Sequence, residues 1–217
     1  MLRLDHVVWA VPRIAPVVAR LGADHGLIAL PGGTHPAWGT RNAVVPLSGA
    51  YLEIVEVADA EVATHGFGGR VATVAAAGGG LAAWCVAVDD ITVFAAERGL
   101  HVTPGSRDTP DGGRLTWRVT GMAEAMASPD LPFMVEWDDP ACAPGMLKAR
   151  HPCGDARVTT LTIATHGAVG EWAYCPELNL GVTTDDGPPG PRSLRLFTDA
   201  GDVVVPHPAP PDRVPTS

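Results

Sequence analysis

Two stretches of the 217-residue chain follow one order of predicted secondary-structure elements. In residues 1–60, the apolar strand "LDHVVWAV" precedes a helix, and the strand-like runs "TRNAVVPL" and "AYLEIVEV" follow it. In residues 81–142, the strand "LAAWCVAV" precedes a helix, which is followed by a hairpin turning at "PDGG" and by the closing strand "PFMVEW". Alternating apolar residues mark the strands, and glycine, proline and aspartate mark the turns. This repetition predicts an α+β fold built from two βαβββ modules.

The remaining segments join or extend the two modules. Residues 61–80 form a connecting segment rich in alanine and glycine, with a short helix predicted over 71–77. Residues 155–205 are predicted to form a C-terminal β-rich extension, with a strand at "VTTLTIAT" and a hairpin turning at "DAGD". Residues 206–217 form a proline-rich tail. The pattern leaves open whether the extension is a truncated third module or an addition to a sheet edge.

Composition and charge indicate which partners and which cellular compartment the protein is expected to have. The net charge is −9 and no cluster of basic residues exists, so a nucleic-acid partner is not expected. No apolar run reaches the roughly 18 residues that a membrane span needs. The N-terminus lacks the apolar stretch and cleavage site of a signal peptide, and the four cysteines show no CxxC spacing. We therefore expect a cytoplasmic protein with reduced thiols and no membrane contact.

Several phrases of the sequence are similar to the glyoxalase-like domain family of the vicinal oxygen chelate superfamily. They are "LDHVVWAV", "HPAWGTRNAVVPL", "YLEIVEV" and "PFMVEWDDP", and the resemblance covers about residues 2–140. The superfamily includes glyoxalase I, the extradiol dioxygenases and methylmalonyl-CoA epimerase. The resemblance implies that the two modules form a half-open curled sheet around a divalent metal ion, whose ligands come from the first and last strands of each module. In that superfamily the ion binds two neighbouring substrate oxygens and stabilises an enolate or a similar anion.

The resemblance implies a metal site made by His6, Glu53 and Glu136. His6 lies on the first strand of the first module, and the two glutamates lie on the closing strands, where a buried carboxylate needs a metal ion or a cation as partner. The fourth position falls on Ala83, which offers no ligand, and a shift by two residues gives Cys85, a poor ligand for a hard ion. Open coordination positions suit a catalytic ion, but the same gap fits a site that has lost its metal. A packed histidine with exposed or salt-bridged carboxylates is the structural alternative.

Four further residues are candidates for substrate binding, namely His35, Trp38, Asn42 and Arg118. In the family, the segment before the third strand borders the cavity, so "HPAW" would form a rigid rim. Asn42 and Arg118 lie on matching strands and would face each other across the cavity, where Arg118 would hold a carboxylate or phosphate group. The alternatives are that Trp38 covers the core, that Asn42 satisfies backbone groups at a bend, and that Arg118 forms a salt bridge with one of the two glutamates, which would argue against a metal.

The leading prediction is a metal-dependent enzyme of glyoxalase type that acts on a small molecule with vicinal oxygens, by lyase, isomerase or dioxygenase-type chemistry. Its cofactor would be a divalent ion such as Zn, Ni, Mn, Fe or Co, and Glu53 or Glu136 would also serve as the catalytic base. The alternative is a non-catalytic protein of the same fold that binds and sequesters a small molecule without a metal. Pairing of exposed strands would give a homodimer.

Overall fold

Two modules with the same order of elements make up the first part of the structure, which is a computed structural model describing residues 2–109, 112–166, 172, 175–183 and 187–206. The first module contains β1 (Leu2–Ala10), α1 (Ile14–His25), β2 (Leu30–His35), β3 (Thr40–Leu47) and β4 (Ala50–Val57). The second contains β5 (Gly80–Val88), α3 (Ile91–Arg98), β6 (Thr103–Asp108), β7 (Arg114–Thr120), α4 (Met122–Ala127) and β8 (Phe133–Trp137). The helix α2 (Gly66–Ala76) connects them and is longer than the helix predicted over 71–77.

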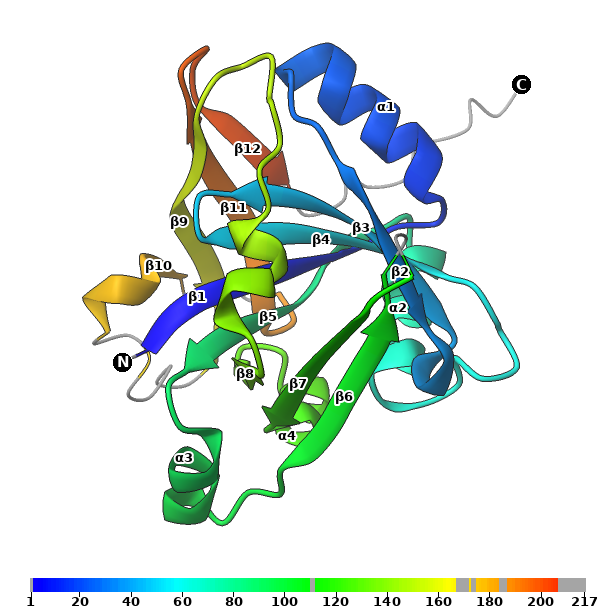
Figure 1. Ribbon diagram of the computed structural model, residues 1–217, viewed down its shortest axis with the longest axis vertical. Coiled ribbons are helices and arrows are strands. Elements are labelled where there is room, and N and C mark those ends of the chain that lie inside the picture. Colours follow the sequence, from blue (N-terminus) through cyan, green and yellow to red (C-terminus); the bar gives the residue numbers. More distant parts are fainter. Residues whose placement is uncertain (1, 110–111, 167–171, 173–174, 184–186, 207–217) are drawn as a thin grey trace.

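The two modules share one curled eight-stranded sheet with the strand order β2-β3-β4-β1-β5-β8-β7-β6 (Figure 1). At its centre β1 and β5 pair antiparallel, and within each module the first strand pairs parallel to the last, β1 with β4 and β5 with β8. The edge strands β2 and β6 come close together, since a Cβ atom on Gly33 of β2 would lie 2.8 Å from the carbonyl oxygen of Asp108 on β6. The predicted α+β fold with two βαβββ modules is confirmed, and its sheet curls until the two edges nearly meet.

The helices of the two modules begin in matching ways. The N–H group of Ile14, at the start of α1, donates to Glu56 Oε2 on β4, and the N–H group of Ile91, at the start of α3, donates to Glu136 Oε2 on β8. A carboxylate at a helix N-terminus satisfies a free N–H group and is favoured by the helix dipole. No described helix combines the length and the apolar character needed to cross a membrane.

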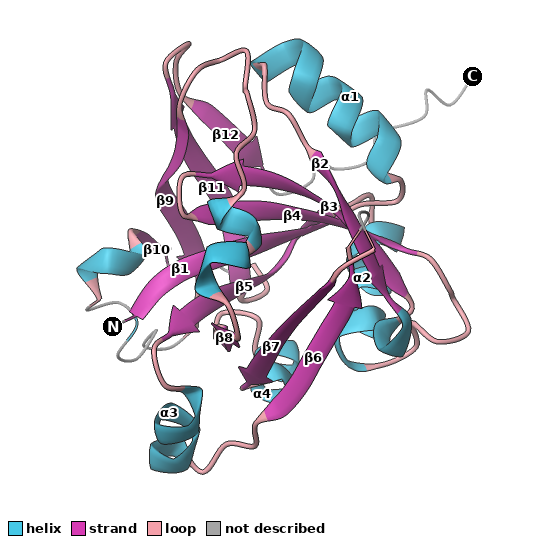
Figure 2. Ribbon diagram, in the orientation of Figure 1, coloured by secondary structure: helices cyan, strands magenta, loops and turns pink. Residues whose placement is uncertain are grey.

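The C-terminal extension forms a second sheet with the order β10-β9-β11-β12 (Figure 2). Its strands are β9 (Ala156–Ala164), β10 (Leu180–Thr183), β11 (Gly190–Thr198) and β12 (Val203–Pro206). Leu161 of β9 and Leu194 of β11 share one core with Leu52 and Trp84, which lie on the outer face of the curled sheet. The extension therefore covers the outer face of the two modules, and is neither a third module nor an addition to a sheet edge.

A second core fills the inner, concave face of the curled sheet. There Phe67 and Val71 of α2 pack with Val8 of β1 and Val55 of β4, and α4 contributes Ala125. The burial of Phe67 in the first turn of α2 explains why this helix begins earlier than its alanine-rich part. This inner face, with α2 beside it, positions the candidate site.

Candidate functional site

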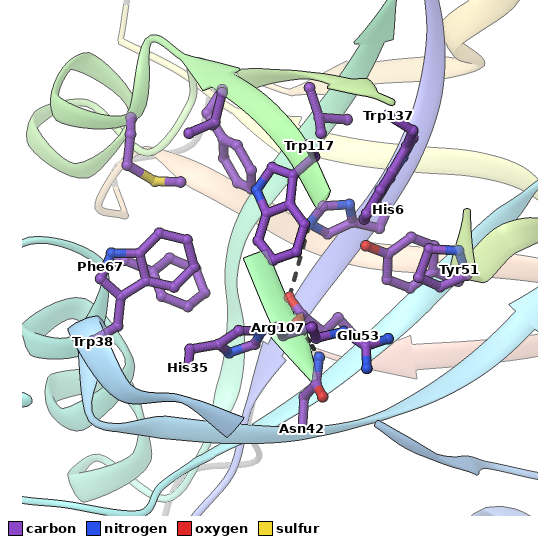
Figure 3. Close-up of a pocket in the computed structure, with 15 residues that line it drawn as sticks. His6, His35, Trp38, Asn42, Tyr51, Glu53, Phe67, Arg107, Trp117 and Trp137 are labelled. Carbon is purple, nitrogen blue, oxygen red and sulfur yellow. Dashed lines mark hydrogen bonds and ion pairs between the residues drawn. The ribbon is translucent and has the colours of Figure 1, made fainter. Parts of the chain in front are cut away.

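A small cavity of about 40 Å³ lies on the inner face of the curled sheet (Figure 3). The aromatic side chains on its wall are those of Trp38, Tyr51, Phe67, Trp117, Phe133 and Trp137. The polar side chains on the wall include those of His6, His35, Asn42, Glu53 and Arg107. An apolar enclosure with a few convergent polar groups is the usual form of a small-molecule site.

His6 is oriented by its neighbour Asp5. The pairing of β1 with β5 shifts register between Leu4 and His6, and a bulge of this kind turns two successive side chains toward one face. Asp5 Oδ1 lies 2.6 Å from His6 Nδ1, while Asp5 Oδ2 accepts a hydrogen bond of 2.8 Å from Trp137 Nε1. Because a carboxylate only accepts, Nδ1 of His6 carries the hydrogen in this pair, and Nε2 is the ring nitrogen that faces the cavity.

Nε2 of His6 faces Glu53. His6 Nε2 lies 3.8 Å from Glu53 Oε2, and both side chains are buried. The imidazole is held between rings, stacked on Tyr51 with centroids 4.6 Å apart and set edge-on to Phe133 at 5.4 Å.

Glu53 is held in turn by Asn42, which is itself bound by the backbone of Gly33 on β2. Asn42 Nδ2 donates to Glu53 Oε1, and Asn42 Oδ1 accepts from the N–H group of Gly33 at 2.7 Å. A Cβ atom on Gly32 would collide with the amide of Asn42, so the glycine makes room for this side chain. Asn42 is therefore a positioning residue for Glu53, in addition to the wall position expected from the sequence.

His35 and Trp38 also reach the cavity. His35 Nδ1 lies 3.2 Å from Thr40 Oγ1, and its ring lies 5.4 Å from that of Trp38. Trp38, in the short 3-10 turn η1 (Pro36–Trp38), packs on Phe67 at 5.0 Å. Burial lowers the pKa of His35 and outweighs the nearby Glu53, so this imidazole is neutral near pH 7.

The structure does not bring Glu136 and Arg118 to the cavity. Arg118 Nη2 donates to Glu136 Oε1 at 2.6 Å, and Arg118 Nη1 donates to Thr92 Oγ1 on α3. The first module has the same arrangement, in which Arg41 binds Glu56. Glu136 is thus the counterpart of Glu56 and not of Glu53. The expected metal set of His6, Glu53 and Glu136 does not assemble, and of the alternatives for Arg118 the salt bridge is the one observed.

The strand register explains this difference. In the first module Val8 of β1 pairs with Glu53 of β4, and in the second module Cys85 of β5 pairs with Phe133 of β8. Phe133 therefore stands where the second module would carry its inward glutamate. Ala83, two residues before Cys85, stands where that module would carry its histidine. Half of the ligand positions implied by the family resemblance hold side chains that cannot bind a metal.

Another group of potential ligands lies beside the cavity. Asp5, His6 and Cys85 place ligand atoms within 4.8 Å of one another. Both oxygens of Asp5 are already engaged, by His6 and by Trp137. Burial, followed by the charges of Asp5 and Glu53, raises the pKa of the Cys85 thiol, so it remains a neutral thiol and a weak ligand. These residues do not fit a tightly bound divalent ion.

Arg107 of β6 lies on the cavity wall and was not among the predicted site residues. Arg118 of β7 was predicted to face the cavity, whereas Leu115 and Trp117 of that strand are buried on the inner face. The signal was present in the sequence, because the apolar set of an alternating strand faces the core. Placing Trp117 inward and pairing β6 with β7 puts Arg107 opposite Leu115, on the same face.

Comparisons with known proteins agree with this geometry. The family model described as "Glyoxalase-like domain" matches residues 4–173. Among solved structures, a hypothetical protein from Staphylococcus aureus aligns with a TM-score of 0.59 at 14% identity, covering 94% of this chain and 84% of that one. The comparison with curated proteins gave no match.

Methylmalonyl-CoA epimerases are also among the similar structures. The enzyme from Mycobacterium tuberculosis aligns with a TM-score of 0.44 at 16% identity, covering 62% of this chain and 86% of that one. The enzyme from Streptomyces coelicolor, in complex with 2-nitronate-propionyl-CoA, aligns with a TM-score of 0.43 at 19% identity, covering 61% of this chain and 94% of that one. Since the family model spans most of the sequence and both modules, the chain belongs to the glyoxalase-like domain family.

Proposed function

We propose that the protein catalyses proton transfer at a carbon next to a carbonyl group, in a small molecule that carries adjacent oxygen atoms. The observation that carries this proposal is the facing pair of His6 Nε2 and Glu53 Oε2, 3.8 Å apart on the wall of a buried cavity. A base and an acid that reach the same substrate typically accelerate such a transfer about 10²- to 10⁴-fold. The family's association with vicinal oxygens supports the substrate class.

The proposed step balances with these two side chains alone for a 2-hydroxy carbonyl compound. The Glu53 carboxylate takes the proton from the carbon that bears the hydroxyl group, and the released electron pair forms a carbon–carbon double bond while the carbonyl π pair moves to oxygen. His6 Nε2 takes the hydroxyl proton and returns it to the other oxygen. Glu53 then gives its proton to the former carbonyl carbon, so the product is an isomer in which one carbon is oxidised and its neighbour reduced, and no outside oxidant or reductant is needed.

The roles of the surrounding residues follow from their contacts. Asp5 holds the imidazole of His6 through Nδ1 and stabilises the imidazolium that forms when Nε2 takes a proton. Asn42 fixes Glu53 by its amide. The aromatic wall excludes bulk water, which strengthens each electrostatic interaction within the cavity.

We assign this chemistry to side chains of the chain rather than to a tightly held divalent ion. The support is that Ala83 and Phe133 occupy two of the positions expected to carry ligands, which leaves His6 and Glu53 alone. Catalytic metal sites commonly use three protein ligands and keep further positions for water or substrate.

A second candidate function is supported by the aromatic wall. Trp38, Trp117 and Trp137 surround the cavity, and large aromatic surfaces of this kind also hold a ligand in proteins that bind without turnover. A binding protein would retain ligand affinity but move no proton. The two candidates therefore differ in one measurable property, the exchange of carbon-bound hydrogen with solvent.

The experiment follows that exchange directly. The full chain is incubated in D2O with glyceraldehyde, lactaldehyde or hydroxyacetone, and NMR records loss of the proton next to the carbonyl group. We expect protein-dependent exchange that falls about 10²-fold or more in Glu53→Gln and in His6→Asn. Glu61→Gln, at an exposed site, is the matched control and should exchange as the unaltered protein does. Binding of these compounds without any exchange would replace the enzyme proposal by the binding one.

A further inference from the structure

Arg107 carries an unsatisfied donor in the interior. Its side chain projects from β6 to the cavity wall, and the residue is only 8% exposed. Among the buried side-chain polar atoms of the described residues, Arg107 Nη1 is the one that has no hydrogen-bond partner. A buried guanidinium N–H donor without a partner is unfavourable, and buried charges in proteins are generally paired. The missing partner is therefore expected to be a ligand.

We propose that Arg107 binds the carboxylate of an anionic substrate, so that the cavity takes small 2-oxo acids that carry a hydroxyl group on the carbon next to the oxo group. This inference rests on the proposed function, because it places the carboxylate on Arg107 and the hydroxyl-bearing carbon against His6 and Glu53. The guanidinium group presents N–H donors in a planar fork that matches the two oxygens of a carboxylate. Figure 3 shows Arg107 beside Glu53 and His35.

The other charges of the cavity do not supply this partner. Glu53 is bound by Asn42 and faces His6, and Asp5 is bound by His6 and Trp137. No ion pair joins Arg107 to a carboxylate within the part of the chain that the structure describes. His35 is neutral near pH 7 because burial lowers its pKa. Arg107 is thus the permanent cation of the cavity, and it selects for an anion.

The fold also makes room for Arg107 at the point where the sheet edges meet. A Cβ atom on Gly33 of β2 would lie 3.1 Å from Arg107 Nη1 and 2.8 Å from the carbonyl oxygen of Asp108. The second glycine of the "GGTH" stretch therefore allows β2 to lie directly against the guanidinium group. The N–H group of Gly33 donates to Asn42 Oδ1, and Asn42 holds Glu53, so one residue of β2 lies against both the proposed anion site and the residue that positions the base.

The test compares two ligands that differ in charge and are similar in shape, pyruvate and 2,3-butanedione. Both carry adjacent oxygens, and only pyruvate carries a carboxylate. The full chain is titrated with each, using the fluorescence of the cavity tryptophans and calorimetry to obtain Kd. The variants are Arg107→Met, Arg107→Lys and the matched control Arg114→Met, whose exposed side chain on β7 binds Ser106.

We expect the unaltered protein and Arg114→Met to bind pyruvate at least about tenfold more tightly than 2,3-butanedione. Arg107→Met should lose at least about tenfold in affinity for pyruvate and keep its affinity for the dione, and Arg107→Lys should lie between them. Arg107→Met should melt at the same temperature as the unaltered protein or higher in the absence of ligand, since it removes an unpaired buried charge. Circular dichroism of each variant checks that the fold is retained.

The inference is overturned if the unaltered protein shows no preference for pyruvate, or if Arg107→Met and Arg107→Lys keep both affinity and preference. A water molecule or Glu53 acting as the partner of Arg107 in solution would give the first of these results. Glu53→Gln and His6→Asn separate this inference from the proposed function. If both variants bind pyruvate normally and proton exchange is nevertheless absent from the unaltered protein, the anion site stands and the proton-transfer proposal fails.

Discussion

Glu56 and Glu136 occupy equivalent places in the two modules and perform the same structural task. Each accepts the first N–H group of its module's helix, from Ile14 or Ile91, and each is bound by an arginine of the neighbouring strand. The repeated pair shows which glutamates of the closing strands belong to the scaffold. Glu53 stands outside this pattern, because its counterpart is Phe133. The chemistry of the site is therefore asymmetric although the fold is nearly symmetric.

Glu56→Ala should destabilise the protein without a direct effect on ligand binding. The substitution leaves the N–H group of Ile14 unsatisfied and Arg41 without its partner, and hydrogen bonds to charged groups contribute about 1.5–3 kcal/mol each. Urea denaturation measures the loss of unfolding free energy. Glu136 is more exposed than Glu56, so Glu136→Gln should lower the free energy of unfolding less and should leave proton exchange unchanged. If Glu136→Gln lost proton exchange while its stability was unaltered, Glu136 would have a direct role in the reaction.

Removal of divalent ions should leave the protein unchanged. Because His6 and Glu53 lack the two partners that Ala83 and Phe133 replace, we expect less than one equivalent of metal per chain after purification without chelators. Elemental analysis by mass spectrometry measures this content. Dialysis against EDTA should alter neither the melting temperature nor proton exchange. If the unaltered protein contained one equivalent of metal per chain and Glu53→Gln contained none, this expectation would be contradicted.

The module repeat was readable from the sequence because alternation and turn residues report local structure. The site was readable only in part. His6, Glu53 and Asn42 do lie together at the cavity, as the resemblance implied. Glu136 and Arg118 were predicted to face inward because the two modules were aligned with Glu136 opposite Glu53, whereas Glu136 is the counterpart of Glu56. In this cavity the wall is aromatic, so Trp117 and Trp137 face inward and the charged pair faces α3.

Contacts between residues remote in sequence explain what else was missed. The bulge at Asp5 depends on pairing between β1 and β5, and a bulge cannot be placed without the partner strand. The approach of Gly33 to Arg107 depends on closure of the sheet, which brings β2 to β6. The position of the C-terminal sheet on the outer face likewise arises from burial of both apolar faces, and no local pattern records it.

Gly33→Ala should weaken pyruvate binding. The new methyl group would come within 3.1 Å of Arg107 Nη1 and 2.8 Å of a backbone oxygen, so β2 and β6 must separate and displace the guanidinium group. We expect a loss of at least about 1 kcal/mol of stability, typical of overpacking, together with weaker pyruvate binding. The control is Gly22→Ala in α1, where the nearest atom to a Cβ lies 3.9 Å away. That change should leave binding intact and stabilise the helix by about 0.5–1 kcal/mol.

Leu161→Ala should destabilise the whole fold rather than the C-terminal sheet alone. Leu161 is fully buried in the core that β9 shares with Leu52 and Trp84, and removal of such a side chain costs about 2–5 kcal/mol. Unfolding in urea, followed by tryptophan fluorescence and by circular dichroism, should show one transition shifted to lower urea. Val204→Ala on β12, at an exposed position, should shift it little. Two separate transitions in Leu161→Ala would show that the extension folds as an independent unit.

Stability should fall as the pH is lowered below 6.5, and His35 should account for part of that fall. Burial lowers the pKa of His35 in the folded protein below the ordinary value of 6.5. As the pH falls below 6.5, the unfolded chain therefore protonates His35 before the folded protein does, and this favours unfolding. The contribution is complete above pH 6.5 and is lost progressively below it. Urea denaturation at pH 7.5 and at pH 5.5 measures the difference. His35→Gln, which keeps a polar group near Thr40, should reduce the pH dependence, whereas the exposed control His25→Gln should not. Equal pH dependence in the unaltered protein and His35→Gln would show that other groups carry the effect.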